Sequence, residues 1–372
     1  MKRPPPSSSS RARAALPSES TLVSPLRFEP RLEERVWGGT TLGRYGKAVA
    51  AGQTVGESWE ISDVEQRPSI VASGAPAGGT LRELMLRHAP SILGQSQAPP
   101  HREGGVQFPL LVKLLDARDD LSIQVHPSDD DLHRAGKSGS GKTEAWVILE
   151  AQPGARIIHG LAPGVDRGAL LDRLEALHGG PLPEGEDAAL FRWVEVRRGD
   201  IVFVPAGTIH AVGSGVLLIE VQQTSDVTYR IYDWGRPGKD GKPRDLHLQE
   251  ARTVSERSAP PCPFSRVGDG VPGASFQPLL AREESQEFQI EALTLGPGSS
   301  AGRVVQLSTG SGASAEFHIL AGFEGTATLA SPSGGAEISA GQVVLLPAAL
   351  GRYEIEAESA QATVLRFLGR VL

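Results

Sequence analysis

Short apolar runs separated by turn residues are the feature that most restricts the fold of this chain. Seven such runs have the length of strands and are rich in Val, Ile and aromatic residues: 108–116, 121–126, 144–151, 155–161, 200–206, 216–223 and 227–234. These residue types favour β-strands. The chain also holds 44 Gly and 28 Pro in 372 residues, and both disfavour helices. We therefore expect an all-β fold with a few short helices, at 80–90 and 167–179, where apolar residues recur at helical spacing.

Composition shifts divide the chain into three parts. Residues 1–24 contain Pro and Ser runs and almost no large apolar residue, which predicts a disordered tail because such a segment cannot offset its ordering entropy. Its prolines and lack of amphipathic period argue against the alternative, a mitochondrial presequence. A Pro- and Gly-rich stretch at 259–273 predicts a boundary between a first domain, 25–262, and a C-terminal domain, 273–372.

The charge and cysteine content exclude several classes of protein. The formal net charge is −7, from 37 Lys and Arg against 44 Asp and Glu, whereas nucleic acids and anionic membranes select cationic surfaces. The single cysteine, Cys262, excludes an internal disulfide. No run reaches the roughly 20 apolar residues of a membrane span. We expect a soluble, cytoplasmic protein that binds neither nucleic acid nor membrane.

Two segments share a spacing that indicates an internal repeat. Residues 199–210, GDIVFVPAGTIH, have the form G-x5-P-x-G-x2-H, and residues 341–352, GQVVLLPAALGR, repeat the first glycine, the strand and the proline. In the second copy Ala349 replaces the second glycine and Arg352 replaces the histidine. The first copy resembles a sequence motif of the cupin family, whose barrels bind metal through interior histidines. The repeat predicts two cupin-type jelly-roll β-barrels, the second of them without a metal site.

The strand at 121–126, LSIQVH, carries an unusual polar face. Side chains alternate between the two faces of a strand, so Ser122, Gln124 and His126 point one way, and Leu121, Ile123 and Val125 point the other. A solvent-facing side would more often carry Lys, Glu or Thr. The pattern therefore favours the interior of a barrel that holds a small polar ligand.

Further polar residues complete a candidate metal site. Lys142 and Glu144 share a face of the next strand, and His210 ends the cupin-like motif. Two nitrogens and two oxygens could then surround one divalent ion, from Gln124, His126, Glu144 and His210. Zn²⁺ accepts His and carboxylate ligands, and Fe²⁺ or Mn²⁺ would also fit this set. The alternative is that both histidines are ordinary polar residues near a barrel rim.

Six blocks in order resemble the type I mannose-6-phosphate isomerases in their shorter bacterial form. They are ERVWGG (34–39), GESWEIS (56–62), FPLLVKLLDARDDLSIQVHP (108–127), GKTEAWVIL (141–149), GDIVFVPAGTIHAVGSG (199–215) and EVQQTSDVTYRIYDWGR (220–236). The resemblance runs from about residue 26 to 250 and more loosely through the C-terminal region. Longer members carry a large helical insertion, for which this chain has room only near 167–179.

The resemblance implies interconversion of mannose 6-phosphate and fructose 6-phosphate with one zinc ion per chain. The four candidate ligands match the family's zinc positions, and Arg230 matches the arginine regarded as catalytic. Positions that line the family's substrate pocket are matched by Lys113, Ser122, Lys142 and Glu220, and Trp37 matches a tryptophan beside it. The expected partner is a small sugar phosphate, and the expected assembly is a monomer or homodimer.

The residues are compatible with proton transfer between neighbouring carbons. In 216–223 Glu220 shares a face with Gln222, opposite Ile219 and Val221, so its carboxylate can point inward and transfer a proton. In 227–234 Arg230 shares a face with Thr228 and Tyr232, and its cation could stabilise an enediolate or bind phosphate. Two alternatives stay open: Glu220 pairs structurally with Arg230, or Lys113 points outward from its apolar run.

Two other functions compete with the isomerase. A cupin oxygenase using Fe²⁺ would need two histidines and a carboxylate but no cations for phosphate, so Lys113, Lys142 and Arg230 count against it. A non-catalytic, sugar-phosphate-binding cupin would be expected to lack a metal ligand or the acid–base pair, yet all matched positions are filled.

Overall fold

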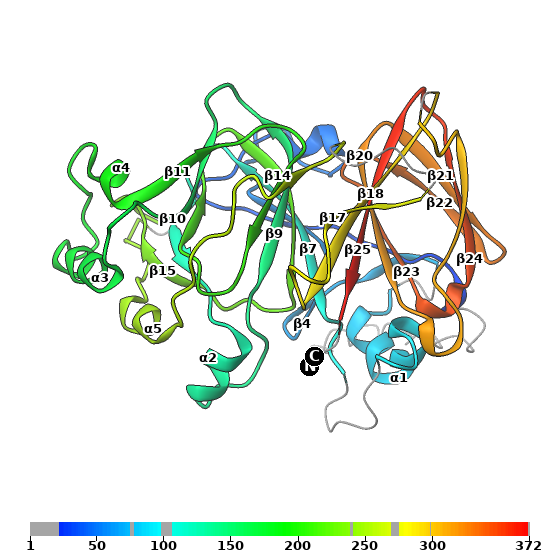
Figure 1. The fold of residues 1–372 in the computed structure, drawn as a ribbon, viewed down its shortest axis with the longest axis horizontal. Helices are drawn as coiled ribbons and strands as arrows, with labels where there is room; N and C mark the ends of the chain where they lie inside the picture. The colour runs from blue at the N-terminus through cyan, green and yellow to red at the C-terminus, as the bar shows by residue number, and fades with distance from the viewer. Residues whose placement is uncertain are drawn as a thin grey trace, which may run out of the picture.

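The computed structural model describes residues 22–74, 78–97, 106–238, 241–268, 275–297 and 299–370, which form two antiparallel β-sandwiches side by side (Figure 1). The first barrel joins a seven-stranded sheet to a five-stranded one. In spatial order the larger sheet contains β16 (Ser265–Arg266), β12 (Asp200–Val204), β9 (Glu144–Ala151), β14 (Val216–Gln223), β7 (Leu110–Ala117), β3 (Glu57–Ile61) and β2 (Arg31–Glu33). The smaller sheet contains β11 (Phe191–Glu195), β10 (Arg156–Leu161), β13 (His210–Val212), β8 (Ile123–Val125) and β15 (Tyr229–Tyr232).

The second barrel repeats this plan with five and four strands. Its larger sheet contains β17 (Gln277–Leu280), β18 (Phe288–Leu295), β25 (Ala362–Gly369), β20 (His318–Glu324) and β23 (Val343–Leu346). Its smaller sheet contains β19 (Val304–Ser308), β24 (Arg352–Ala357), β21 (Thr326–Ser331) and β22 (Gly334–Ser339). Two small ribbons pair β1 (Arg27–Phe28) with β6 (Val71–Ser73), and β4 (Asp63–Val64) with β5 (Arg67–Pro68). The prediction of an all-β fold with two cupin-type barrels is confirmed.

Central strands of the first barrel are buried on both faces, which explains their nearly continuous apolar sequence. In β7, for example, all eight residues are buried. Val112 and Leu114 pack outward into a core shared with the second barrel, whereas Leu115 packs inward. That shared core joins the two large sheets, and the rings of Phe108 and Phe317 meet across it at 4.8 Å between centroids.

The internal repeat is visible in the register of the strands. In the first barrel Val204, just before Pro205, lies opposite Glu144, and in the second Leu346, just before Pro347, lies opposite His318. Strands β12 and β23 therefore occupy equivalent places, as do β9 and β20. His210 is buried at the start of β13, whereas Arg352 is exposed at the start of β24.

Both predicted helices are present, and three shorter ones are added. They are α1 (Leu81–Leu93) and α3 (Arg167–Ala176), accompanied by α2 (Asp129–Arg134), α4 (Glu186–Leu190) and α5 (Leu248–Thr253). Thr80 and Glu83 cap α1 reciprocally, and Ser128 and Asp131 do the same for α2. Apolar residues of α3 and α5 cover the outer face of the five-stranded sheet. None of the helices in the described ranges has the length and apolar run needed to cross a bilayer.

The predicted division into a tail and two domains stays a prediction, and two observations bear on its boundaries. Most of the predicted tail, residues 1–21, lies outside the described residues, but residues 22–24 are packed: Leu22 is fully buried in the shared core, and Ser333 Oγ donates to the carbonyl of Val23 at 2.7 Å. A single large apolar residue is enough to dock this segment. At the other boundary β16, which follows the predicted first domain, pairs with β12 and so belongs to the first barrel. Residues 269–274 of the predicted junction lie outside the described residues.

We expect Leu22→Ala to lower the free energy of unfolding by about 2–5 kcal/mol, the usual cost of removing a fully buried leucine side chain. Denaturant unfolding of the two proteins measures this difference. The neighbouring Val23 is only partly buried, so Val23→Ala serves as the control and should cost less. Equal stability of Leu22→Ala and the parent chain would show that the segment does not contribute to the core.

Candidate functional site

Two histidines and a glutamate from three separate strand ends meet inside the first barrel. Glu144 begins β9, His210 begins β13, and His126 directly follows β8. Glu144 Oε1 lies 3.3 Å from His210 Nε2, and Glu144 Oε2 lies 3.5 Å from His126 Nε2. All three side chains are buried, and one donor atom from each lies within 4.8 Å of the others. The barrel therefore gathers three potential metal ligands at one point.

The backbone fixes the orientation of both imidazole rings. His126 Nδ1 lies 3.1 Å from the carbonyl oxygen of Val227, and His210 Nδ1 lies 2.8 Å from that of Thr208. Because these carbonyls can only accept, each Nδ1 carries the proton and each Nε2 presents a lone pair toward Glu144. Burial lowers the pKa of His210 to about 4 and holds the pKa of His126 well below its usual value. Both rings are therefore neutral at physiological pH, the form that binds metal.

The donor atoms fit a divalent ion in their spacing, and they already surround one cationic side chain. Ligands of a tetrahedral zinc ion at about 2.1 Å from the metal lie about 3.4 Å apart, close to the two nitrogen–oxygen distances above. Glu144 Oε2 is buried and accepts no hydrogen bond of good geometry within the described residues. Lys142 Nζ nevertheless lies 2.7 Å from it and 3.1 Å from His126 Nε2. Glu144 and His126 therefore direct acceptor atoms at the Lys142 ammonium, which shows that this point stabilises positive charge.

Gln124, the fourth predicted ligand, lies beside this group. Its Nε2 is 3.2 Å from His210 Nε2, and the two residues are directly paired between β8 and β13. A half-turn of the amide would present its oxygen to the same point. Gln124 also pairs with Arg230 on the other side of β8. Its role as a ligand stays a prediction.

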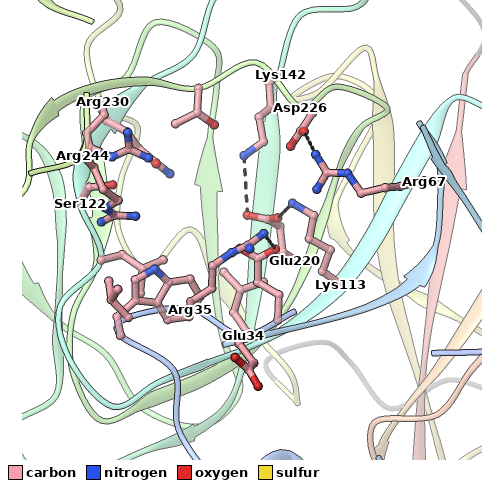
Figure 2. Close-up of a pocket in the computed structure, with 17 residues that line it drawn as sticks. Glu34, Arg35, Arg67, Lys113, Ser122, Lys142, Glu220, Asp226, Arg230 and Arg244 are labelled. Carbon is pink, nitrogen blue, oxygen red and sulfur yellow. Dashed lines mark hydrogen bonds and ion pairs between the residues drawn. The ribbon is translucent and has the colours of Figure 1, made fainter. Parts of the chain in front are cut away.

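Gln124 and Lys142, which contact this group, line a cavity of about 560 Å³, shown in Figure 2. Every residue predicted as catalytic or substrate-binding lines it: Trp37, Lys113, Ser122, Lys142, Glu220 and Arg230. Leu121 also lines the cavity, although alternation placed it on the opposite face from Ser122. Leu121 precedes the first residue of β8, so the strand's alternation does not extend to it. The part that each residue plays in binding or catalysis stays a prediction.

A buried network of charges borders the His–Glu–His group, and it decides between the alternatives left open for Glu220 and Lys113. Lys113 Nζ lies 3.2 Å from Glu220 Oε2, 3.1 Å from Gln222 Oε1 and 4.7 Å from the ring centre of Trp59. Lys113 therefore points into the barrel. Glu220 pairs with Lys113, and more distantly with Lys142 at 4.0 Å, rather than with Arg230.

Lys142 stays protonated in this network. Burial alone would lower the pKa of Lys142, but Glu144 and Glu220 outweigh it and raise the pKa above its usual value. The ammonium group thus remains available as a cation between the two carboxylates.

Several residues that line the cavity were not predicted from the sequence. Arg35 forms a two-pronged ion pair with Glu57, at 2.9 and 3.0 Å, and Arg67 pairs with Asp226. Against the effect of its burial, nearby Lys113 and Arg35 lower the pKa of Glu57 to about 2. Outside the cavity lining, His159 lies in β10 directly opposite His210. Strand alternation within GESWEIS could have indicated Glu57, whereas the arginines come from segments whose placement depends on tertiary packing.

The opposite side of the cavity is lined by arginines. Arg230 Nη1 donates to the carbonyl of Asp245 at 2.9 Å, and its buried Nε has no hydrogen-bond partner within the described residues. Burial, with the neighbouring charges of Arg244 and Arg236, lowers the pKa of Arg230. Tyr232 was predicted to share the face of Arg230, which is wrong. A bulge between them turns Tyr232 into the outer core, where its hydroxyl accepts from Leu182 N at 2.7 Å.

Comparisons with known proteins agree with this geometry. Residues 26–139 match the family model described as "Phosphomannose isomerase type I, catalytic domain". Mannose-6-phosphate isomerase ManA of Bacillus subtilis is 40% identical over 236 residues, covering 63% of this chain and 69% of its own. A crystal structure of the Bacillus subtilis mannose 6-phosphate isomerase superposes with a TM-score of 0.75 at 28% identity, covering 92% of this chain and 99% of its own.

One structure with the same fold contains bound metal ions. A mannose 6-phosphate isomerase solved with bound zinc and yttrium shares the fold, with a TM-score of 0.65 at 17% identity over 93% of this chain and 99% of its own.

Proposed function

The chain belongs to the type I phosphomannose isomerases, and from this membership we propose that it interconverts mannose 6-phosphate and fructose 6-phosphate. The observation that carries the proposal is a buried His–Glu–His group next to a cavity lined by lysines, arginines and Glu220, with Lys142 in contact with both. An aldose–ketose isomerase needs a positioned base, an electrophile for the developing oxyanion and a cation for the phosphate. The cavity holds side chains suited to each need.

We propose that Gln124, His126, Glu144 and His210 hold one divalent ion, zinc by preference. The neutral imidazoles and the carboxylate suit Zn²⁺, and the same set would accept Fe²⁺ or Mn²⁺. When bound, the ion polarises oxygen atoms of the sugar and orients them. Val227 and Thr208 hold the two rings in the tautomer that this role needs.

Glu220 is the proposed proton carrier. Its carboxylate removes the proton from C2 of the open-chain aldose, which leaves an enediolate, and returns that proton to C1, while the hydroxyl proton of O2 passes to O1, to give the ketose. Glu220 is buried, and Lys113 Nζ holds one carboxylate oxygen at 3.2 Å. This ion pair fixes the position of the Glu220 carboxylate, as proton transfer to and from carbon requires.

Arg230 is the proposed stabiliser of the negative charge that develops on the enediol oxygens. Arg230 contacts no carboxylate within the described ranges, so its positive charge is not neutralised by a pair. Ser122, Lys142 and Trp37 are proposed to contact the sugar, because they line the same cavity.

A coupled assay for fructose 6-phosphate tests the function. We expect turnover of mannose 6-phosphate by the metal-loaded protein, loss of turnover after chelation, and recovery when Zn²⁺ is restored. The assay is run with and without oxygen, because a cupin oxygenase would depend on oxygen and the isomerase does not. A metal-loaded, folded protein that forms no fructose 6-phosphate would refute the proposed function.

A further inference from the structure

Two arginines, Arg236 and Arg244, share one buried carboxylate beside the cavity, and a third arginine, Arg230, lies next to them. Asp233 accepts from the Nε of Arg244 at 2.6 Å and from the Nε and Nη2 of Arg236 at 3.1 and 3.0 Å. Arg230 lies beside this group without a carboxylate partner among the described residues. The three guanidinium groups outnumber the two carboxylates near them, Asp233 and Asp245, so positive charge is in excess here.

On the rest of the cavity wall the cations are paired with carboxylates, and Glu34 adds a further negative charge to the lining. There each cation contacts a carboxylate: Arg35 with Glu57, Arg67 with Asp226, Lys113 with Glu220, and Lys142 with Glu144. A phosphate monoester carries nearly two negative charges at neutral pH. Electrostatics therefore direct such a group toward the arginine side, away from the paired side.

Arg244 is placed to bind an anion on that side of the cavity. Asp233 takes hydrogen bonds from the Nε and Nη2 of Arg244, and no bond to its Nη1 occurs within the described residues. Figure 2 shows the guanidinium groups of Arg244 and Arg230 next to each other at the cavity wall, close to Ser122. A guanidinium held rigidly on one side loses little entropy when its remaining N–H groups bind phosphate oxygens.

We propose that Arg244, held in place by Asp233, binds the phosphate of the substrate and makes the enzyme specific for phosphorylated sugars. This inference rests on the proposed function and extends it. With the phosphate at Arg244 the sugar extends across the cavity toward Glu220, and Arg230 is left for the reacting oxygens.

The test compares Arg244→Ala with Arg236→Ala in the metal-loaded enzyme. Arg236 binds the same carboxylate but does not line the cavity, so Arg236→Ala is the matched control. Each protein is assayed with mannose 6-phosphate, and inorganic phosphate is titrated as a competitive inhibitor. For Arg244→Ala we expect KM and the inhibition constant of phosphate to rise at least ~10-fold with kcat changed less than ~3-fold. Arg236→Ala should change each value less than ~3-fold, and Arg244→Lys should recover part of the loss.

Two results would overturn the inference. One is an inhibition constant for phosphate that Arg244→Ala leaves unchanged, and the other is an equal loss in Arg236→Ala, which would assign the effect to the shape of the loop. Calorimetric titration of the parent protein and Arg244→Ala with inorganic phosphate gives the same comparison without turnover. Failure of the isomerase assay therefore remains distinct from failure of this assignment.

Discussion

Replacing His210 with alanine is expected to abolish bound metal and isomerase turnover together. His210 supplies one of the three buried donors, and its Nε2 faces Glu144 at 3.3 Å. Without it the site keeps a single imidazole, and the ammonium of Lys142 at 2.7 Å competes with the ion for the carboxylate. We expect metal content to fall from one equivalent per chain to a trace, and turnover to fall by roughly 1000-fold or more, since the lost charge stabilisation amounts to several kcal/mol.

Elemental analysis and the coupled assay measure the two losses on the same sample. His126→Ala should behave in the same way, because its Nε2 approaches the other oxygen of Glu144. His133 is exposed on α2, so His133→Ala is the control that should keep both metal and turnover. Full zinc occupancy in either His126→Ala or His210→Ala would contradict the ligand assignment.

Arg230→Ala is expected to keep the metal and lose most of the turnover. Arg230 lies outside the donor group, and its guanidinium donates to the carbonyl of Asp245, so metal content should not change. Removing one well-placed donor to a developing oxyanion costs about 10²–10³ in kcat in other enzymes. We expect a loss of that size in kcat, in contrast to the effect on KM expected for Arg244→Ala.

Single-turnover or steady-state kinetics at saturating mannose 6-phosphate separate these effects. Arg230→Lys keeps the charge without the planar fork and should recover only part of the rate. A kcat close to that of the parent enzyme would show that Arg230 serves only to hold the chain at Asp245. Loss of metal in Arg230→Ala would also count against the assignment.

Strand alternation predicted much of the site because regular β-structure fixes the direction of each side chain. Lys142 and Glu144 share a face in the structure and touch, and Glu220 and Gln222 both contact Lys113 from the inside of the barrel. Within regular strands a period of two is a physical constraint. Alternation predicted the face of each donor within its strand, and the resemblance to the cupin motif and to the family predicted that the separate strands bring them together.

The same reasoning failed where the chain departs from regular strands. The bulge in β15 reverses Tyr232 relative to Arg230, and a single inserted residue is enough to do so. Arg67 comes from a two-residue strand in a small ribbon, and Arg244 from the connection after β15. Their positions depend on how distant segments pack, which local pattern does not contain. Leu22 was missed for a related reason, since one apolar residue in a polar segment gives no periodic signal.

The core shared by the two large sheets makes the second barrel part of the energetics of the first. Strands β7, β9 and β14, which frame the donor group, have their outer faces against β18, β20 and β25. Neither sheet can expose that face to water without a large loss of buried apolar surface. The two barrels should therefore melt as one cooperative unit, and an ion held in the first should raise the melting temperature of the second. The rigidity of the strands around the donor group therefore depends on their packing against the second barrel.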